Sequence, residues 1–229
     1  SMVPIGAAVK DGFDAGHGLP FDSEGMKQRY PGIFFSQFTG AELVADKWNL
    51  SREDLDQFAL ESHQKAANAT ESNFFDREIL PVKGKNAEGI EDMVIADEGI
   101  RFDASFEALS GLNPVTEGGV ITAGNASQIT DGAAALMICN DAGLKKVKAD
   151  PRARIVGISV VGDDPILMLG GPIPASHKVL KETKLKIDDI DLYEVNEAFA
   201  PVPLSWAIEL KADIAKLNVN GGAMALGHP

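Results

Sequence analysis

The sequence is poor in cysteine and has no long apolar run. Its 229 residues include one cysteine, Cys139, so a disulfide within the chain is excluded and a cysteine-based metal site nearly so. We expect a reducing compartment, most simply the cytoplasm. No stretch approaches the ~18 consecutive apolar residues of a membrane helix, and the first residues lack the basic and apolar parts of a signal peptide. We therefore expect no membrane partner.

Basic side chains are also scarce. The chain has 34 acidic and 21 basic residues, a net charge of −13, which argues against a nucleic-acid partner because such binding needs a basic surface. An anionic small ligand is still allowed, since it requires only a local positive pocket. The four histidines lie too far apart in the sequence to suggest a metal cluster, so we expect no metal.

The first half of the chain predicts two helices joined near Asn49. Residues 1–35 are rich in Gly and Pro and read as a loop or extended lead-in. From residue 36 apolar positions recur at helical spacing, and Ser51 with Asp54 three residues later forms a capping-box pattern. Short extended pieces are expected at 79–83 and 93–97.

The second half alternates between helical and extended patterns. Small residues from 120 predict a buried helix that leads into a buried strand at 133–139, which contains Cys139. Further strands are expected at 154–162 and 191–195. Helices are expected at 141–148, 174–185 and 197–210. This alternation predicts a layered α/β core. The chain ends on a glycine-rich turn, which we interpret as an interruption of a longer protein.

Three segments carry candidate chemistry, and each has a purely structural alternative. Asn196 and Glu197 follow a predicted strand, where α/β sheets bind ligands, but on these residues alone a helix N-cap is the favoured interpretation of Asn196. His228 lies between Gly227 and Pro229 and could be a general base or a turn residue. The small residues 122–135, with a hydroxyl at Ser127, suit a ligand pocket or tight helix–sheet packing.

Together and in this order, these segments resemble the thiolase family. The motifs TAGNAS at 122–127, NEAF at 196–199 and GHP at 227–229 match that family, as do GPIPAS at 171–176 and the stretch around AELVADKWNLSR. The resemblance covers essentially the whole chain. It implies a two-step Claisen-type reaction through an acyl-cysteine, with acyl-CoA as substrate.

The resemblance also implies roles for individual residues. His228 would activate the nucleophilic cysteine and help hold the thioester oxyanion, and Asn196 would position a water in the same oxyanion hole. The CoA-binding residues it implies are Arg101 near the nucleotide, Ala123 and Ser127 along the pantetheine arm, and Ala198, Phe199 and Met168 near the thioester. Both catalytic cysteines of the family fall outside this sequence. We expect Cys139 to be buried and unable to replace them, so the chain alone should be inactive.

The family fold has two similar layered α/β halves and an inserted loop domain that holds CoA, and it would be incomplete here. Residues 1–128 would form the loop domain, 129–160 the end of the first half and 161–229 the beginning of the second. Full-length thiolases of this kind are expected to be homo-oligomers, dimers or tetramers. A degradative enzyme acting on lipid or steroid side chains is the leading hypothesis. A biosynthetic acetoacetyl-CoA synthase and a non-catalytic CoA- or lipid-binding relative are the alternatives.

Overall fold

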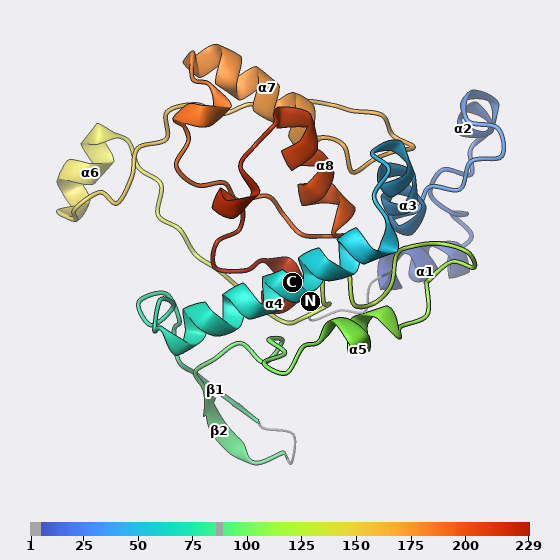
Figure 1. Ribbon diagram of the computed structural model, residues 1–229. Coiled ribbons are helices and arrows are strands. Elements are labelled where there is room, and N and C mark those ends of the chain that lie inside the picture. The colour runs from blue at the N-terminus through green and yellow to red at the C-terminus, as the bar shows by residue number, and fades with distance from the viewer. Residues whose placement is uncertain (1–5, 86–88) are drawn as a thin grey trace.

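The structure, a computed structural model, describes residues 6–85 and 89–229 (Figure 1). Within these residues it is dominated by helices arranged around one long helix, α4 (Arg52–Glu71). Short 3-10 turns occur at Ile187–Asp189 and Ile214–Lys216. The remaining elements are α1 (Ala7–Asp14), α2 (Glu24–Arg29), α3 (Gln37–Lys47), β1 (Val82–Lys85), β2 (Glu91–Val94), α5 (Phe106–Ser110), α6 (Asp141–Val147), α7 (Pro172–Thr183), α8 (Pro201–Leu210) and α9 (Ala223–Leu226).

The predicted pair of helices joined near Asn49 is confirmed as α3 and α4. Asn49 adopts a positive φ of 53°, a conformation that asparagine tolerates better than most residues, and this lets the chain turn sharply between the helices. The capping box is also present. The Ser51 side chain accepts from the Asp54 backbone N–H, and the Asp54 carboxylate accepts from the Ser51 N–H at 2.8 Å.

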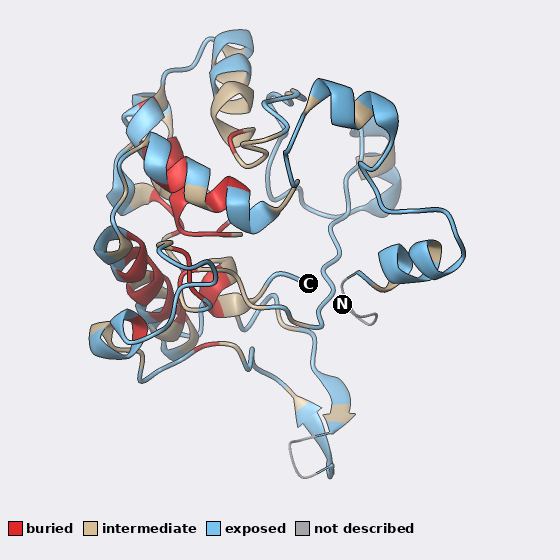
Figure 2. Cartoon of the chain, turned by 90° about the vertical axis from the view of Figure 1, so that its right-hand side faces the viewer, coloured by how far each residue is buried: buried red, intermediate tan, exposed pale blue. Residues whose placement is uncertain are grey.

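The core lies where α4 meets α3, α8 and the loops between them. Leu55, Phe58 and Ala59 on α4 are buried, and they pack in one cluster with Trp206 of α8 and Ile121. Figure 2 shows the buried residues gathered on α4, α8 and the segments between them, while the elements on the other side of that view are largely exposed. This core places the chemically interesting loops along one side of α4.

A two-stranded antiparallel hairpin projects from the end of α4. Strand β1 pairs with β2 in a register that sets Val82 opposite Val94 and Lys85 opposite Glu91. The extended pieces expected at 79–83 and 93–97 therefore exist, but the strands are shifted toward the connecting turn. In Figure 1 the hairpin points away from the core.

The lead-in at 1–35 is less irregular than expected, because it contains α1 and α2. The Ser23 hydroxyl accepts from the Met26 N–H at 3.3 Å and begins α2, a local cap that the Gly and Pro content obscured. Neither helix buries a residue. Residues 1–5 of this predicted loop lie outside the described residues.

Two expected strands are absent from the described part of the chain. Residues 133–139 and 154–162 have no ladder partner there, and most of their apolar side chains stay exposed, at 90% for Leu136 and 80% for Val160. A strand is stabilised by hydrogen bonds to a neighbouring strand, so apolar content alone did not produce one. The burial expected for Cys139 is also wrong, because this residue is exposed. The helix expected before residue 133 is absent, and bends and irregular backbone stand in its place.

Of the expected α/β alternation, the described residues form the helices, while the strands are absent or reduced to a single bridge. The helices expected at 141–148 and 174–185 are confirmed as α6 and α7. The strand expected at 191–195 is reduced to one parallel bridge between Tyr193 and Leu217. A hollow of about 490 Å³ separates this segment from residues 157–159. Helix α8 begins at Pro201, not at residue 197, because proline suits the first turn of a helix.

Candidate functional site

The TAGNAS and NEAF segments lie side by side. The Ser127 N–H donates to the Ala198 carbonyl at 3.0 Å, and the Ala200 N–H donates to the Asn125 carbonyl at 2.9 Å. The two segments are thereby bridged in antiparallel fashion at Ala126 and Phe199. This pairing explains why residues 122–132 form no helix, since a helix would use the same backbone groups internally.

The GHP loop joins the same assembly through Gln128. The His228 N–H donates to the Gln128 carbonyl at 3.0 Å, and Gln128 Nε2 donates to the Met224 carbonyl at 2.8 Å. Gly227 has a φ of 90°, and a Cβ there would lie 2.3 Å from Thr130 Oγ1. Only glycine fits this turn, which fixes the backbone just before His228. The His228 side chain is exposed.

The arginine in the GIRFD segment is held nearby. Gln128 Nε2 also donates to the Gly99 carbonyl at 2.7 Å, and the Arg101 N–H donates to His63 Nδ1 on α4 at 3.1 Å. The Arg101 side chain is exposed. Burial, with a smaller effect from the Arg101 charge, lowers the pKa of His63. A neutral imidazole is the form that can accept this backbone hydrogen bond at Nδ1.

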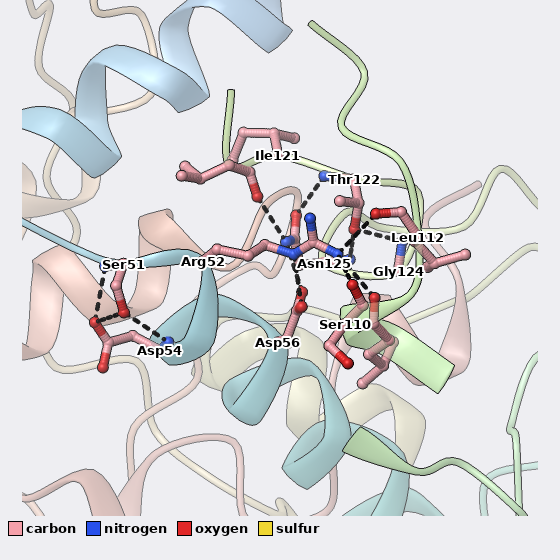
Figure 3. Close-up of polar contacts among 12 residues, drawn as sticks. Ser51, Arg52, Asp54, Asp56, Ser110, Leu112, Ile121, Thr122, Gly124 and Asn125 are labelled. Atoms are coloured by element: carbon pink, nitrogen blue, oxygen red, sulfur yellow. Dashed lines mark hydrogen bonds and ion pairs between the residues drawn. The ribbon is translucent and has the colours of Figure 1, made fainter. Parts of the chain in front are cut away.

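A buried polar network supports the TAGNAS turn from below (Figure 3). The Asn125 side chain donates to Asp56 Oδ1 at 2.9 Å and to the Val120 carbonyl at 3.0 Å, and accepts from the Thr122 N–H. Arg52 Nε pairs with Asp56 Oδ2 at 2.6 Å. Asn125 and Asp56 are fully buried, so the TAGNAS turn is fixed to the first turns of α4.

Glu197 is the second buried polar centre. Its carboxylate accepts from Ser62 Oγ at 2.6 Å, from Asn218 Nδ2 at 2.8 Å and from the Met224 N–H at 3.2 Å. These donors come from α4, from the segment after the last 3-10 turn and from α9. The side chain at the centre of the NEAF motif therefore points inward, while its neighbour Asn196 is exposed.

The other expected site residues lie as follows. Asn196 is not a helix N-cap, since α8 is preceded by Ala200 in that position. Phe199 is buried and packs edge-to-face on Phe38 of α3, with ring centroids 5.4 Å apart. Met168 lies against the same helix, because a Cβ on Gly40 would come 3.1 Å from its Cγ. Ala123 is exposed at the TAGNAS turn, and Ser127 is half-buried.

The only cysteine is far from this assembly. Cys139 lies two residues before α6, whose residue Gly143 packs against it. Helix α6 is at the edge of the molecule in Figure 1, well separated from the C-terminal end that carries His228. The thiol and the imidazole are thus not a nucleophile–base pair in this structure.

Sequence patterns did not single out the residues that hold these loops. Ser62 and His63 lie within a predicted helix, and Asn218 lies within a segment of alternating pattern. Gln128 lies next to the TAGNAS motif. None of these positions marks a residue as part of a site. One signal was available for the two on α4, since both interrupt the apolar side of a helix otherwise lined by residues such as Ala59 and Ala66. A polar residue on a buried helix face needs a hydrogen-bond partner elsewhere in the fold.

The described residues hold neither a metal-binding cluster nor a membrane-spanning helix. Across residues 6–85 and 89–229, no group of three or more His, Cys, Asp or Glu side chains is arranged to hold a metal ion. No helix of that part of the chain is both long enough and apolar enough to span a membrane.

Comparison with protein families and known proteins identifies consistent relatives. The family described as thiolase, N-terminal domain, matches residues 24–142, and the thiolase C-terminal domain matches 149–229. The chain is similar to a steroid 3-ketoacyl-CoA thiolase of Mycobacterium tuberculosis, with 46% identity over all of this chain and 55% of the relative. It is 47% identical to mitochondrial 3-ketoacyl-CoA thiolase of Bos taurus over 82% of this chain and 48% of the relative.

Solved structures give the same result. Human mitochondrial 3-ketoacyl-CoA thiolase matches with a TM-score of 0.80 and 43% identity over 84% of this chain and 48% of that one. The Bacillus anthracis acetyl-CoA acetyltransferase matches with a TM-score of 0.81 and 40% identity over 87% of this chain and 50% of that one. The expected fold is therefore confirmed, and the chain spans about half the length of the relatives it matches.

Proposed function

Because the chain belongs to the thiolase family, we propose that it forms part of a CoA-dependent acyltransferase that cleaves 3-ketoacyl-CoA by thiolysis. The observation that carries this proposal is the convergence of the three motifs: Ser127 hydrogen-bonds to Ala198, and the adjacent Gln128 hydrogen-bonds to His228. Relatives named as 3-ketoacyl-CoA thiolases support the same activity. The reverse Claisen condensation uses the same groups.

In the proposed reaction, a cysteine thiolate attacks the 3-keto carbon and the bond between C2 and C3 breaks. The acetyl-CoA carbanion that leaves takes a proton from a second cysteine, and the thiol of free CoA then releases the acyl group from the first. The only cysteine of this chain is distant from His228, so both thiols would come from elsewhere in the longer protein. The chain by itself is then inactive.

His228 and Asn196 are the proposed catalytic residues of this chain. His228 would take the proton from the nucleophilic thiol and then donate a hydrogen bond to the thioester oxyanion. Asn196 would hold a water that supplies the second donor. Such donors must lie ~2.7–3.1 Å from the oxyanion. The side chains of Asn196 and His228 suit this task because both are exposed, while the backbone of their loops is held by hydrogen bonds.

The proposed CoA contacts lie on the same set of hydrogen-bonded loops. The Gln128 side chain donates to the Gly99 carbonyl, which joins the segment of Ser127 to the segment of Arg101. Ser127 directly precedes Gln128, and Arg101 follows Gly99 by two residues, so both residues lie near this hydrogen bond. Ser127 and Ala123 would line the pantetheine arm, with Arg101 nearer the nucleotide. Ala198, Phe199 and Met168 would border the acyl end. Support comes from the packing of Phe199 and Met168 against α3, at Phe38 and Gly40, and from the related human enzyme solved with CoA.

Domain limits, assembly and compartment belong to the same proposal. Residues 1–128 would be the CoA-binding loop domain, 129–160 the end of the first half and 161–229 the start of the second. The complete enzyme would be a cytoplasmic homo-oligomer that degrades fatty or steroid acyl chains. A relative named as a steroid thiolase supports the degradative direction. Turnover of matched fatty and steroid 3-ketoacyl-CoA substrates would distinguish them.

The test compares the full-length enzyme with its His228→Ala and Asn196→Ala variants and with the 229-residue chain. Acetoacetyl-CoA and free CoA are supplied, and acetyl-CoA formation and cysteine acylation are followed by mass spectrometry. His228→Ala should reduce kcat by about 10³-fold with little change in CoA affinity, because its contribution arises in the transition state. Turnover by the chain alone, or acylation of Cys139, would contradict the proposal.

A further inference from the structure

The carboxylate of Glu197 is in an unusual position for a charged group. It is 1% exposed, and burying a carboxylate is costly unless hydrogen bonds replace its hydration. Its three donors are the Ser62 hydroxyl, the Asn218 amide and the Met224 N–H, at 2.6, 2.8 and 3.2 Å. All three donors are neutral groups whose hydrogen bonds have preferred directions. They therefore hold the carboxylate in one position relative to three different segments, which a mobile counter-ion would not do.

Hydrogen bonds from one of these donors, Asn218, and from the TAGNAS segment fix the backbone on both sides of Asn196. Asn218 accepts from the Val195 N–H at 2.9 Å and donates to the Val195 carbonyl at 2.8 Å, while its amide also reaches Glu197. On the other side, the Ala198 carbonyl accepts from Ser127. Asn196 itself is exposed between these fixed residues. The backbone that carries Asn196 is therefore fixed on both sides.

The same carboxylate also fixes the glycine-rich loop that leads to His228. The Gly222 N–H donates to Ser62 Oγ at 3.2 Å, and the Ser62 hydroxyl in turn donates to Glu197. A Cβ at Gly222 would come within 2.3 Å of the Glu197 carboxylate. The loop must hence be glycine at this point, because its backbone packs directly on the carboxylate. Ser62 extends the contact to α4.

We propose that Glu197 is a positioning residue that holds Asn196 and the loop of His228 in one fixed relative geometry, with Ser62 as its link to α4. This inference rests on the proposed acyltransferase function of Asn196 and His228. Both side chains must converge on one thioester oxygen, and a displacement of 1 Å at a reaction centre can cost about 10²-fold in rate. The network then influences the rate of acylation far more than the affinity for CoA.

The test measures the rate of cysteine acylation by acetoacetyl-CoA in the full-length enzyme, by rapid quench and mass spectrometry. Glu197→Gln keeps the shape and one acceptor oxygen but turns an amide N–H₂ toward one of its donors. We expect acylation to fall about 100-fold while the Kd of CoA changes less than about 3-fold. Ser62→Ala should reduce acylation about 10-fold, and the double variant should be no slower than Glu197→Gln, since both act through one hydrogen bond.

Ser205→Ala is the matched control. Ser205 is a buried serine like Ser62, but its hydroxyl donates to the Val202 carbonyl within its own helix. The Ser205→Ala variant should be acylated at the same rate as the parent enzyme. Amide hydrogen exchange of residues 222–228 gives a second measurement that does not depend on the chemistry. Ser62→Ala should speed exchange there relative to Ser205→Ala.

The outcomes separate the two proposals. If the parent enzyme is not acylated, the proposed function fails, and hydrogen exchange still decides whether Ser62 and Glu197 hold the loop. If the parent is acylated and Glu197→Gln matches it, the positioning role is wrong. Parallel losses of acylation, CoA affinity and melting temperature would likewise overturn it in favour of general stability. If Glu197→Gln does not fold, the comparison of Ser62→Ala with Ser205→Ala decides.

Discussion

Replacing Asp56 with alanine should be among the most damaging single changes to stability outside the reaction centre. Asp56 is 0% exposed and accepts from Arg52 Nε at 2.6 Å and from Asn125 Nδ2 at 2.9 Å. Its removal leaves a partly buried guanidinium without its carboxylate and a buried amide short of one acceptor. Breaking such a pair typically costs 3–5 kcal/mol, and an unsatisfied buried amide costs about 1–3 kcal/mol.

Two features of the structure reduce this sum. The Arg52 side chain is 23% exposed and keeps the Leu109 and Leu112 carbonyls as acceptors, at 2.8 and 3.0 Å. Asn125 keeps its bond to the Val120 carbonyl. We therefore expect about 3 kcal/mol of lost unfolding free energy, near the lower limit for a broken buried pair.

The assay is urea unfolding of the full-length protein, followed by circular dichroism, with Glu53→Ala as the control. Glu53 lies three residues earlier on α4 but is exposed, so its replacement should change stability by less than about 0.5 kcal/mol. The stability of Asp56→Asn should lie between those of Asp56→Ala and Glu53→Ala. Its amide oxygen can still accept from Asn125, while its amide NH₂ would face the Arg52 guanidinium. Equal midpoints for Asp56→Ala and Glu53→Ala would refute the reasoning.

Three further predictions concern local features. Ser51→Ala should cost about 1 kcal/mol of unfolding free energy by removing the α4 cap, and equal urea midpoints would contradict it. Burial lowers the pKa of His63 in the folded state. Its contribution to folding stability is therefore complete above the ordinary histidine pKa of about 6.5 and is lost as the pH falls. His63→Gln should therefore lose less stability than the parent between pH 7 and 5, and parallel urea-midpoint curves would count against this. Gly227→Ala, at a φ of 90° and against Thr130, should lower kcat by at least about tenfold, and an unchanged kcat would show that the turn tolerates a side chain.

Local patterns predicted some of the helices, although they missed α1 and α2 and wrongly predicted a helix from residue 120. The capping box at Ser51, the turn at Asn49 and the helices α6 and α7 all depend on groups within a few residues of one another, and the structure confirms them. The strands at 133–139 and 154–162 depend instead on a partner, and none lies beside them in the described residues. Apolar composition indicates that a segment can join a sheet, but it does not supply the neighbour.

The motif residues were predictable for a different reason. TAGNAS, NEAF and GHP could be found because their sequence is restricted by backbone turns and by the chemistry of the proposed site. Their spatial convergence could be inferred only from the family resemblance, since nothing in the local sequence specifies that Ser127 meets Ala198. The orientation of Glu197 was missed entirely. A glutamate next to a candidate catalytic asparagine suggests chemistry, whereas its burial depends on residues up to 135 positions away.

One helix accounts for most of the convergence. Three buried polar residues of α4, namely Asp56, Ser62 and His63, each reach a different motif: the asparagine of TAGNAS, the glutamate of NEAF and the backbone of the GIRFD loop. A purely apolar helix face would bind these loops through the hydrophobic effect alone. That effect is non-directional, so it would not fix the position of each loop along the helix. Each hydrogen bond fixes one atom of one loop to one turn of the helix, and an unmet partner would be costly in the buried site. The polar interruptions on α4 thus set the relative positions of the loops, while its alanines let the loops approach closely enough for those bonds to form.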